Sequence, residues 1–142
     1  MKDTIDQMYI CSPPGTHIDE TPFGYTLGLI SGKYKMIILY WISEYEEIRY
    51  NQLKRCIQTI SDRTLSQTLK ELEADGLVIR KEFSQIPPKV EYSLSERGES
   101  LIPLLDFMCM WGHQNRPDPV DGSVSELHES QNCTACASRT NL

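Results

Sequence analysis

Residues 61–94 read SDRTLSQTLKELEADGLVIRKEFSQIPPKVEYSL, and this stretch decides the fold class. Its first half opens with Ser61, a favourable N-cap residue, and Gly76 suits the left-handed position that ends a helix. Between them leucine recurs at helical spacing, at Leu65, Leu69 and Leu72. The stretch therefore predicts a helix over residues 62–75 with one buried face.

The second half of the stretch predicts a β-hairpin. Apolar and polar residues alternate over 77–83 and again over 90–94, as they do in half-buried strands. Residues 85–89 lie between these runs and include Pro87 and Pro88, which lack the N–H group that a strand ladder needs. We therefore expect two antiparallel strands joined by a proline-stiffened turn.

A shorter helix is predicted just upstream, over residues 50–57, with Leu53 and Ile57 facing inward and a short extended link at 48–50 before it. Two short helices joined by a tight turn and followed by a hairpin are arranged as in a winged helix-turn-helix. The second helix of that motif has the dimensions to enter the major groove of DNA. The centre of the chain therefore predicts a DNA-binding module.

The flanking segments predict the helices that complete the core. Thr21 followed by Pro22 is typical of a helix start, and residues 33–44 carry a broad apolar face, as expected of a central helix. A last helix is predicted to begin at Ser95, with a kink at Pro103. The expected fold is mainly α with a small β-hairpin wing.

Length and hydropathy limit the domain organisation and the location. A chain of 142 residues holds one modest core, so we expect a flexible arm at 1–20, one folded domain at 21–115 and a disordered tail at 116–142. The longest apolar run, residues 36–42, is far shorter than the roughly 20 residues of a membrane helix. Because the N-terminus also lacks a signal-peptide pattern, we expect a cytoplasmic protein with no membrane partner.

The formal net charge of −6 is unusual for a DNA-binding protein, but it is distributed unevenly. The predicted arm and tail together hold eight acidic residues and three basic ones. Residues 49–70 carry one acid, Asp62, against five bases: Arg49, Lys54, Arg55, Arg63 and Lys70. Positive charge is therefore concentrated over the predicted helix-turn-helix, as phosphate binding requires.

The face of the 62–75 helix opposite its leucines carries residues that suit base contacts. Steps of about 100° per residue place Arg63, Gln67 and Lys70 opposite Leu65. Arg63 suits a bidentate contact to guanine and Gln67 one to adenine. Other residues on or beside this face suit phosphates or flexible base contacts: Ser61, Thr64, Ser66 and Lys70. An ordinary solvated helix face is the alternative.

Basic residues outside this helix are candidates for further phosphate contacts. They come from the preceding helix and from the predicted hairpin: Arg49, Lys54, Arg55, Arg80, Lys81 and Lys89. Lys89 is expected at the hairpin tip. The alternative for each is a solubilising surface charge.

Four stretches resemble the HxlR-type family of winged helix-turn-helix regulators, whose fold is similar to that of the MarR group. They are ISGKYK at 30–35, RYNQL at 49–53, LKELEADGLV at 69–78 and PPKVEYSLSERG at 87–98. The resemblance covers about residues 21–112. It implies a bacterial or archaeal transcriptional regulator, repressor or activator, that binds a pseudo-palindromic double-stranded DNA operator as a homodimer, without a cofactor.

The resemblance also implies that the first and last helices form most of the subunit interface. Apolar residues of both predicted helices fit this role: Phe23, Leu27, Leu101, Leu105, Met108 and Trp111. Two positions depart from the family pattern, which usually has tryptophan where Tyr34 stands and often has cysteine where Thr21 stands. The second departure removes the cysteine that redox-sensing members use.

The five cysteines are odd in number and scattered, so we expect reduced thiols: Cys11, Cys56, Cys109, Cys133 and Cys136. One hypothesis is that Cys11 or Cys56 senses oxidants or electrophiles through an intersubunit disulfide, given the family's habit and Arg55 beside Cys56. Buried or idle thiols are the alternative. Regulation by a small-molecule effector is a further alternative.

Cys133 and Cys136 have the spacing of half a zinc site or of a redox pair, with His113 and His128 as candidate further ligands. The pair lies in the predicted tail, away from a fixed frame, so we expect no metal site. A thiol oxidoreductase using this pair and a winged helix used for protein contacts are the alternatives to DNA binding. The sequence lacks a Ser-His-Asp grouping, a phosphate-binding glycine loop and a paired-carboxylate motif, which favours a regulator over an enzyme.

Overall fold

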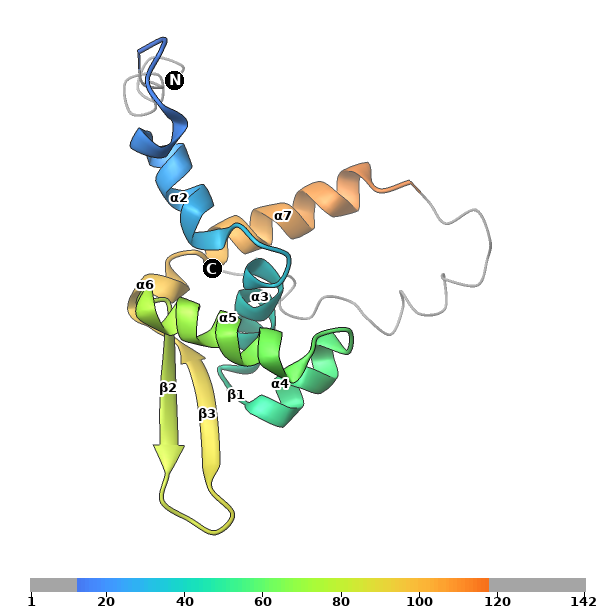
Figure 1. Cartoon of the computed structure of the whole chain (residues 1–142). Helices are drawn as coiled ribbons and strands as arrows, with labels where there is room; N and C mark the ends of the chain where they lie inside the picture. The colour runs from blue at the N-terminus through green and yellow to red at the C-terminus, as the bar shows by residue number, and fades with distance from the viewer. Residues whose placement is uncertain (1–12, 118–142) are drawn as a thin grey trace.

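A helix of apolar residues, α3 at Lys35–Tyr45, forms the centre of the domain in this computed structural model, which describes residues 13–117 (Figure 1). Ile38, Leu39 and Ile42 of this helix are buried. The elements around it are η1 (Ile18–Glu20), α2 (Pro22–Ile30), β1 (Glu47–Arg49), α4 (Tyr50–Ile57), α5 (Asp62–Ala74), β2 (Val78–Phe83), β3 (Lys89–Leu94), α6 (Glu96–Glu99) and α7 (Ile102–Asn115). The fold is the mainly α, winged arrangement that the sequence predicts.

The helix boundaries follow the capping residues in the sequence. Thr21 accepts a hydrogen bond from the backbone N–H of Gly24 at the start of α2, and Ser61 accepts one from the N–H of Thr64 at the start of α5. After α5, Gly76 adopts a φ of +74°, which glycine tolerates without a steric penalty. The predictions for α2, α4 and α5 are confirmed.

The wing belongs to a three-stranded antiparallel sheet in the order β1-β3-β2. β2 and β3 form the predicted hairpin, which ends with Phe83 opposite Lys89. Lys89 therefore starts β3 and does not lie in the tip, where the sequence analysis expected it. β1 pairs with the other edge of β3 and places Ile48 opposite Tyr92. The sequence predicts only an extended link there, because three residues are too few to show alternation.

The prediction of one kinked C-terminal helix is wrong. The chain forms two helices, α6 and α7, which are separated at Ser100 and Leu101. Pro103 is the second residue of α7, where a missing N–H loses no helical hydrogen bond, so it helps to start a helix instead of kinking one. Ser95 caps the short α6 by accepting a hydrogen bond from the N–H of Gly98.

The segment expected to be a flexible arm includes η1, a 3-10 helix of one turn. This turn lies against α2, where a Cβ on Gly24 would be 1.8 Å from the backbone oxygen of Ile18. The hydroxyl of Thr21 donates a hydrogen bond of 2.6 Å to the same oxygen. This close approach requires glycine at position 24.

One cluster of buried apolar side chains holds the elements together. It draws on α3, α4, α5, the three strands and α7: Ile38, Leu39, Ile42, Ile48, Leu53, Ile57, Ile60, Leu65, Leu69, Leu72, Leu77, Val78, Tyr92 and Leu105. Only Leu105 comes from α7, and α2 adds only the half-buried Leu29 and Ile30 at the edge of the cluster. Most apolar side chains of α2 and α7 therefore lie outside the core.

Arg97 ties the end of α5 to α2. Its guanidinium donates a hydrogen bond of 2.8 Å to the backbone oxygen of Asp75 and another to the hydroxyl of Tyr25. Ser95 adds a hydrogen bond of 2.5 Å from its hydroxyl to the backbone oxygen of Gly76. These contacts join α2, the C-terminal end of α5 and the start of α6.

The substitution Gly98→Ala is expected to destabilise the domain. A Cβ at this position would lie 2.1 Å from the backbone oxygen of Leu77, so the contact between α6 and the start of β2 has to open. Overpacking of this kind costs about 1–3 kcal/mol. Urea unfolding followed by circular dichroism measures the loss. Gly28→Ala is the matched control, since a Cβ there meets no atom within 4 Å among residues 13–117, and equal midpoints for the two variants would contradict the prediction.

Candidate nucleic-acid interface

Helix α5 presents a polar face to solvent while its three leucines are buried. Arg63, Gln67 and Lys70 are all exposed, as their positions opposite Leu65 predict. The side-chain amide of Gln67 donates to the carboxylate of Glu71 over 3.3 Å. Within residues 13–117, Arg63 and Lys70 make no ion pair with a carboxylate. Both charges are therefore available to an anionic partner.

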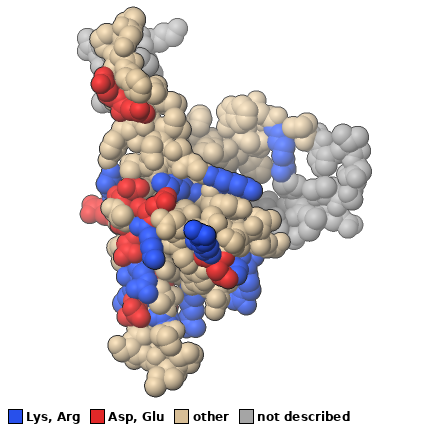
Figure 2. All heavy atoms as spheres, in the orientation of Figure 1, with Lys and Arg blue, Asp and Glu red and all other residues tan. Residues whose placement is uncertain are grey.

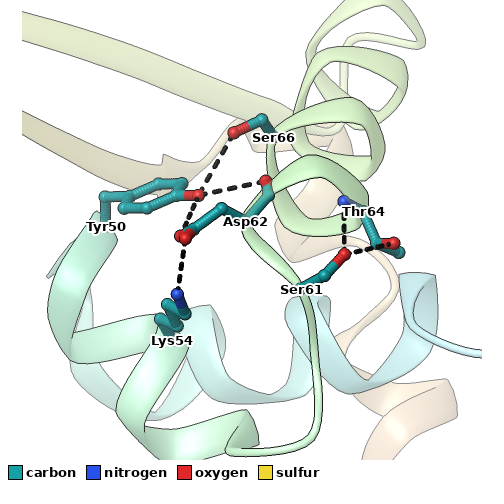
Figure 3. Close-up of polar contacts among 6 residues, drawn as sticks. All are labelled: Tyr50, Lys54, Ser61, Asp62, Thr64 and Ser66. Carbon is teal, nitrogen blue, oxygen red and sulfur yellow. Dashed lines mark hydrogen bonds and ion pairs between the residues drawn. The ribbon is translucent and has the colours of Figure 1, made fainter.

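Two hydroxyl groups order the first turn of α5 (Figure 3). The hydroxyl oxygen of Ser61 accepts from the backbone N–H of Thr64 at 3.1 Å and donates to the hydroxyl of Thr64 at 2.9 Å. Ser61 and Thr64, both predicted to contact DNA, are exposed. The hydroxyl of Ser61 is already used for capping, which leaves that of Thr64 freer to donate outward.

Tyr50 on α4 holds the first turn of α5 from another side (Figure 3). Its hydroxyl lies 3.1 Å from Oδ1 of Asp62, 3.2 Å from the backbone oxygen of Asp62 and 3.2 Å from Oγ of Ser66. Lys54 adds an ion pair, with Nζ 2.7 Å from Oδ2 of Asp62. Ser66 and Lys54, both predicted to contact DNA, therefore also fix α5 against α4.

The carboxylate of Asp62 is the one acidic group in the basic segment, and its neighbours stabilise its charge. The ammonium group of Lys54, and after it the hydroxyl of Tyr50, lower the pKa of the Asp62 carboxyl below its usual value. The group is therefore ionised at neutral pH and holds Lys54 beside α5. This pairing offsets part of the positive charge that the sequence places here.

A groove of about 1020 Å³ lies between α5, α4 and the wing. Among the described residues, Glu73 is the single acidic residue that lines it. Five basic residues also line it: Arg49, Arg55, Lys70, Arg80 and Lys89. Polar side chains that the sequence analysis did not single out also line it: Tyr50, Asn51, Gln52 and Gln85. The sequence did contain a signal for two of them, because Asn51 and Gln52 directly follow Arg49 at the start of a helix. The groove brings basic side chains from three separate segments together.

Arg80 and Lys89, two wing residues predicted to contact phosphates, form ion pairs with carboxylates. Nη1 of Arg80 lies 3.2 Å from Oε2 of Glu82, and Nζ of Lys89 lies 2.7 Å from Oε1 of Glu91. Lys89 also lies over the ring of Phe83, 4.6 Å from its centre, and its charge lowers the pKa of the Glu91 carboxyl. A DNA phosphate has to compete with these carboxylates.

Lysine and arginine side chains gather over the middle of one face and along the hairpin (Figure 2). Acidic side chains are interspersed on the hairpin side of this face, as the ion pairs of the wing require. The sequence predicts a phosphate-binding surface over α4, α5 and the two wing strands, which hold Lys54, Arg55, Arg63, Lys70, Arg80, Lys81 and Lys89.

Helices α2 and α7 extend from the end of the domain opposite the hairpin tip and carry a large exposed apolar surface (Figure 1). Four of the predicted interface residues lie on it: Phe23, Leu27, Met108 and Trp111. Leu105 is instead buried in the core of the domain, and Leu101 is half-buried against that core. The sequence analysis missed four further members: Tyr25, Leu104, Phe107 and Met110. No helix within residues 13–117, α7 included, is long and apolar enough to cross a membrane.

Cys56 lies half-buried on α4, and its Sγ is 4.0 Å from the hydroxyl of Tyr45. This contact raises the pKa of the Tyr45 hydroxyl. Among the other residues of the redox and zinc hypotheses, His113 lies on α7. The remaining four lie outside the described residues: Cys11, Cys133, Cys136 and His128. Within residues 13–117, no three histidine, cysteine, aspartate or glutamate side chains are grouped as metal ligands.

The helix-turn-helix and wing have counterparts in one family of regulators. Residues 29–119 match the profile of the family described as HxlR-like helix-turn-helix. The chain belongs to this family. An HTH-type transcriptional regulator of Halalkalibacterium halodurans is 57% identical over 100 residues, which are 70% of this chain and 88% of the relative. The regulator YdzF of Bacillus subtilis is 55% identical over 93 residues, or 66% of this chain and 85% of the relative.

Solved structures of related regulators have the same fold. The oxidised form of the redox regulator HypR matches with a TM-score of 0.64 and 44% identity over 68% of this chain and 98% of HypR. A regulator of the MarR family from Porphyromonas gingivalis matches with a TM-score of 0.65 and 36% identity over 68% of this chain and 94% of that one. The HxlR-family protein is thus a transcriptional regulator with a helix-turn-helix DNA-binding domain, and its relatives are named HTH-type transcriptional regulators.

The substitution Lys54→Gln is expected to raise the pKa of the Asp62 carboxyl toward its ordinary value, because it removes the ammonium group that stabilises the carboxylate most. Titration of the side-chain carbon by NMR measures this pKa. Arg55→Gln is the matched control, since it removes a neighbouring charge on α4 that makes no ion pair with Asp62 among the described residues. A pKa of Asp62 that is the same in wild type and Lys54→Gln would contradict the assignment.

Proposed function

We propose that this regulator binds a pseudo-palindromic operator as a homodimer and reads it with the exposed face of α5. The observation that carries the proposal is the arrangement of Arg63, Gln67 and Lys70 on one exposed face of a helix that adjoins the basic groove. Two such helices in one dimer reach successive major grooves, about one helical turn apart. The half-sites of the operator should then have that spacing.

Base reading is proposed for two residues of α5. The guanidinium of Arg63 makes a bidentate contact to guanine, and the amide of Gln67 makes one to adenine. Gln67 has to exchange its hydrogen bond with Glu71 for the base, so its contribution is the smaller of the two.

Phosphate binding is proposed for the residues that surround the groove and the first turn of α5. The unpaired Lys70 binds most directly, whereas three others exchange a carboxylate for a phosphate: Lys54, Arg80 and Lys89. The rest of the set is Arg49, Arg55, Ser61, Thr64 and Ser66. Because each ammonium or guanidinium that neutralises a phosphate releases counterions, operator affinity falls steeply with salt.

Dimerisation is proposed through the exposed apolar surface of α2 and α7. Phe23 is 67% exposed and Trp111 is 61% exposed in the isolated subunit, and large contiguous apolar surface is typical of subunit interfaces. Leu101 and Leu105 hold α7 on its own core, so their contribution to the dimer is to position this helix.

Arg63→Ala and Gln67→Ala are each expected to weaken binding to a duplex that the wild-type protein selects from a random pool. Losing a bidentate base contact costs about 1–3 kcal/mol, or roughly 5- to 150-fold in affinity. Fluorescence anisotropy measures the affinity for the selected duplex and for a scrambled one. Arg116→Ala is the control because it removes the same charge just beyond α7, and an equal loss in Arg116→Ala and Arg63→Ala would contradict base reading by α5.

Trp111→Glu is expected to convert the dimer to a monomer at micromolar concentration, since it places a charge in the centre of the proposed interface. Sedimentation velocity measures the mass in solution, and circular dichroism checks that the subunit stays folded. Gln114→Glu adds the same charge at an exposed polar position of α7 and serves as the control. A folded Trp111→Glu protein that remains dimeric would refute an interface formed by α7.

Redox regulation is proposed through Cys56, supported by the half-buried position of this thiol and by the likeness to a protein named a redox regulator. Diamide would oxidise the thiol of Cys56 and a thiol of the other subunit to an intersubunit disulfide, with both protons and both electrons passing to the reduced hydrazine. Operator affinity is expected to change after diamide treatment in the wild type and not in Cys56→Ser. An unchanged wild-type affinity would refute the proposal.

A further inference from the structure

The tip of the wing is uncharged and projects beyond the rest of the domain. Residues 84–88 read SQIPP, and Ile86 in their centre is fully exposed, at 102% of its reference area. Figure 1 shows the hairpin extending away from the helices, and Figure 2 shows no lysine or arginine on its tip. A single exposed isoleucine is ordinary on a protein surface. At the end of a projecting hairpin, it is the first apolar group that a partner meets.

The hairpin restricts the position of Ile86, so little conformational entropy is lost when this side chain is bound. Pro87 and Pro88 restrict the backbone directly after Ile86. The strands remain paired up to Phe83 opposite Lys89, and the ring of Phe83 lies under two ammonium groups. A side chain presented on such a stem loses little freedom when it is bound.

Three basic residues lie behind the uncharged tip, and because Glu82 and Glu91 pair with two of them, the stem carries a net charge of +1. Arg80 and Lys81 on β2 and Lys89 on β3 surround the stem, as Figure 2 shows for the basic side chains along the hairpin. A matching partner has negative charge on the rims of a narrow recess that is itself lined by apolar groups. The minor groove of DNA has this character, with phosphates on both edges and sugar C–H groups on its walls.

The tip is continuous with the surface that we propose to bind DNA. Gln85, Pro87 and Pro88 line the same groove as Ser66 and Lys70 of α5. When α5 lies in a major groove, the tip therefore lies next to the adjoining backbone and the minor groove beyond it. That groove is roughly 6 Å wide in B-DNA, which suits one aliphatic side chain.

We propose that Ile86 is an apolar wedge that enters the minor groove outside each half-site and makes affinity depend on how easily the DNA opens there. Apolar side chains inserted from the minor groove unstack base steps, and pyrimidine–purine steps deform most readily. Ile86 thus selects flanking sequence through DNA deformability, without a hydrogen bond to a base. The inference rests on the proposed DNA-binding function and adds a second determinant of specificity to it.

The experiment is selection of duplexes from a random pool with full-length wild type, Ile86→Ala and the matched control Ile79→Ala. Ile79 is 49% exposed on β2, so this control removes the same atoms from the stem instead of the tip. All three proteins are expected to select the same inner half-sites. Only wild type and Ile79→Ala should enrich pyrimidine–purine steps at a fixed position outside them.

Affinity measurements on the selected duplexes give a second readout. Replacing the enriched flank by an A-tract should weaken wild-type binding about 5- to 10-fold and leave Ile86→Ala unaffected, since A-tracts are stiff and resist opening. The slope of log affinity against log salt should be equal in wild type and Ile86→Ala, because no phosphate contact is removed.

Equal flank preferences in wild type and Ile86→Ala would overturn the inference and leave the reading by α5 intact. Failure of the wild type to select any half-site would overturn the proposed function, and the wedge with it. Sedimentation with phosphatidylglycerol vesicles that is lost in Ile86→Ala, together with unchanged DNA affinity of that variant, would overturn the wedge in favour of a lipid partner.

Discussion

The burial of one face of α5 is the constraint on which the rest of the structure depends. Leu65, Leu69 and Leu72 are at most 1% exposed and share a core with α3 and the strands, and burying each leucine contributes about 1.5–3 kcal/mol. Because an α-helix has 3.6 residues per turn, burying this face turns Arg63 and Gln67 outward. The same leucines thus stabilise the fold and orient the surface that we propose to read DNA.

Contacts at both ends of α5 connect this surface to the rest of the subunit. At its start, Tyr50 and Lys54 of α4 hold Asp62, so that α4 and the first turn of α5 form one unit. At its end, Arg97 joins Asp75 to Tyr25 of α2. In the proposed dimer α2 contacts the second subunit. A change in how the subunits are arranged therefore acts on α5 through α2 and Arg97.

The sequence predicts most of this fold because its strongest signals are local. The leucine repeat of α5, the caps at Thr21 and Ser61 and the alternation of the wing strands each lie within a few residues of the element they define. Features that depend on distant partners were missed. The pairing of β1 with β3 is such a feature, because the two strands are far apart in the sequence. The carboxylates of Glu82 and Glu91 lie only two residues from Arg80 and Lys89, on the same faces of the strands, so the sequence did contain a signal for these ion pairs. The chain also ends α6 and begins α7 where the sequence predicts a kink.

Dimethyl sulfate footprinting of the wild-type complex tests the central claim most directly, because this reagent methylates guanine N7 in the major groove, where Arg63 is proposed to bind. On a duplex selected by the protein, we expect protected guanines in two clusters about one helical turn apart, one for each recognition helix. Guanines that remain fully reactive throughout a bound, specific site would contradict reading of the major groove by α5.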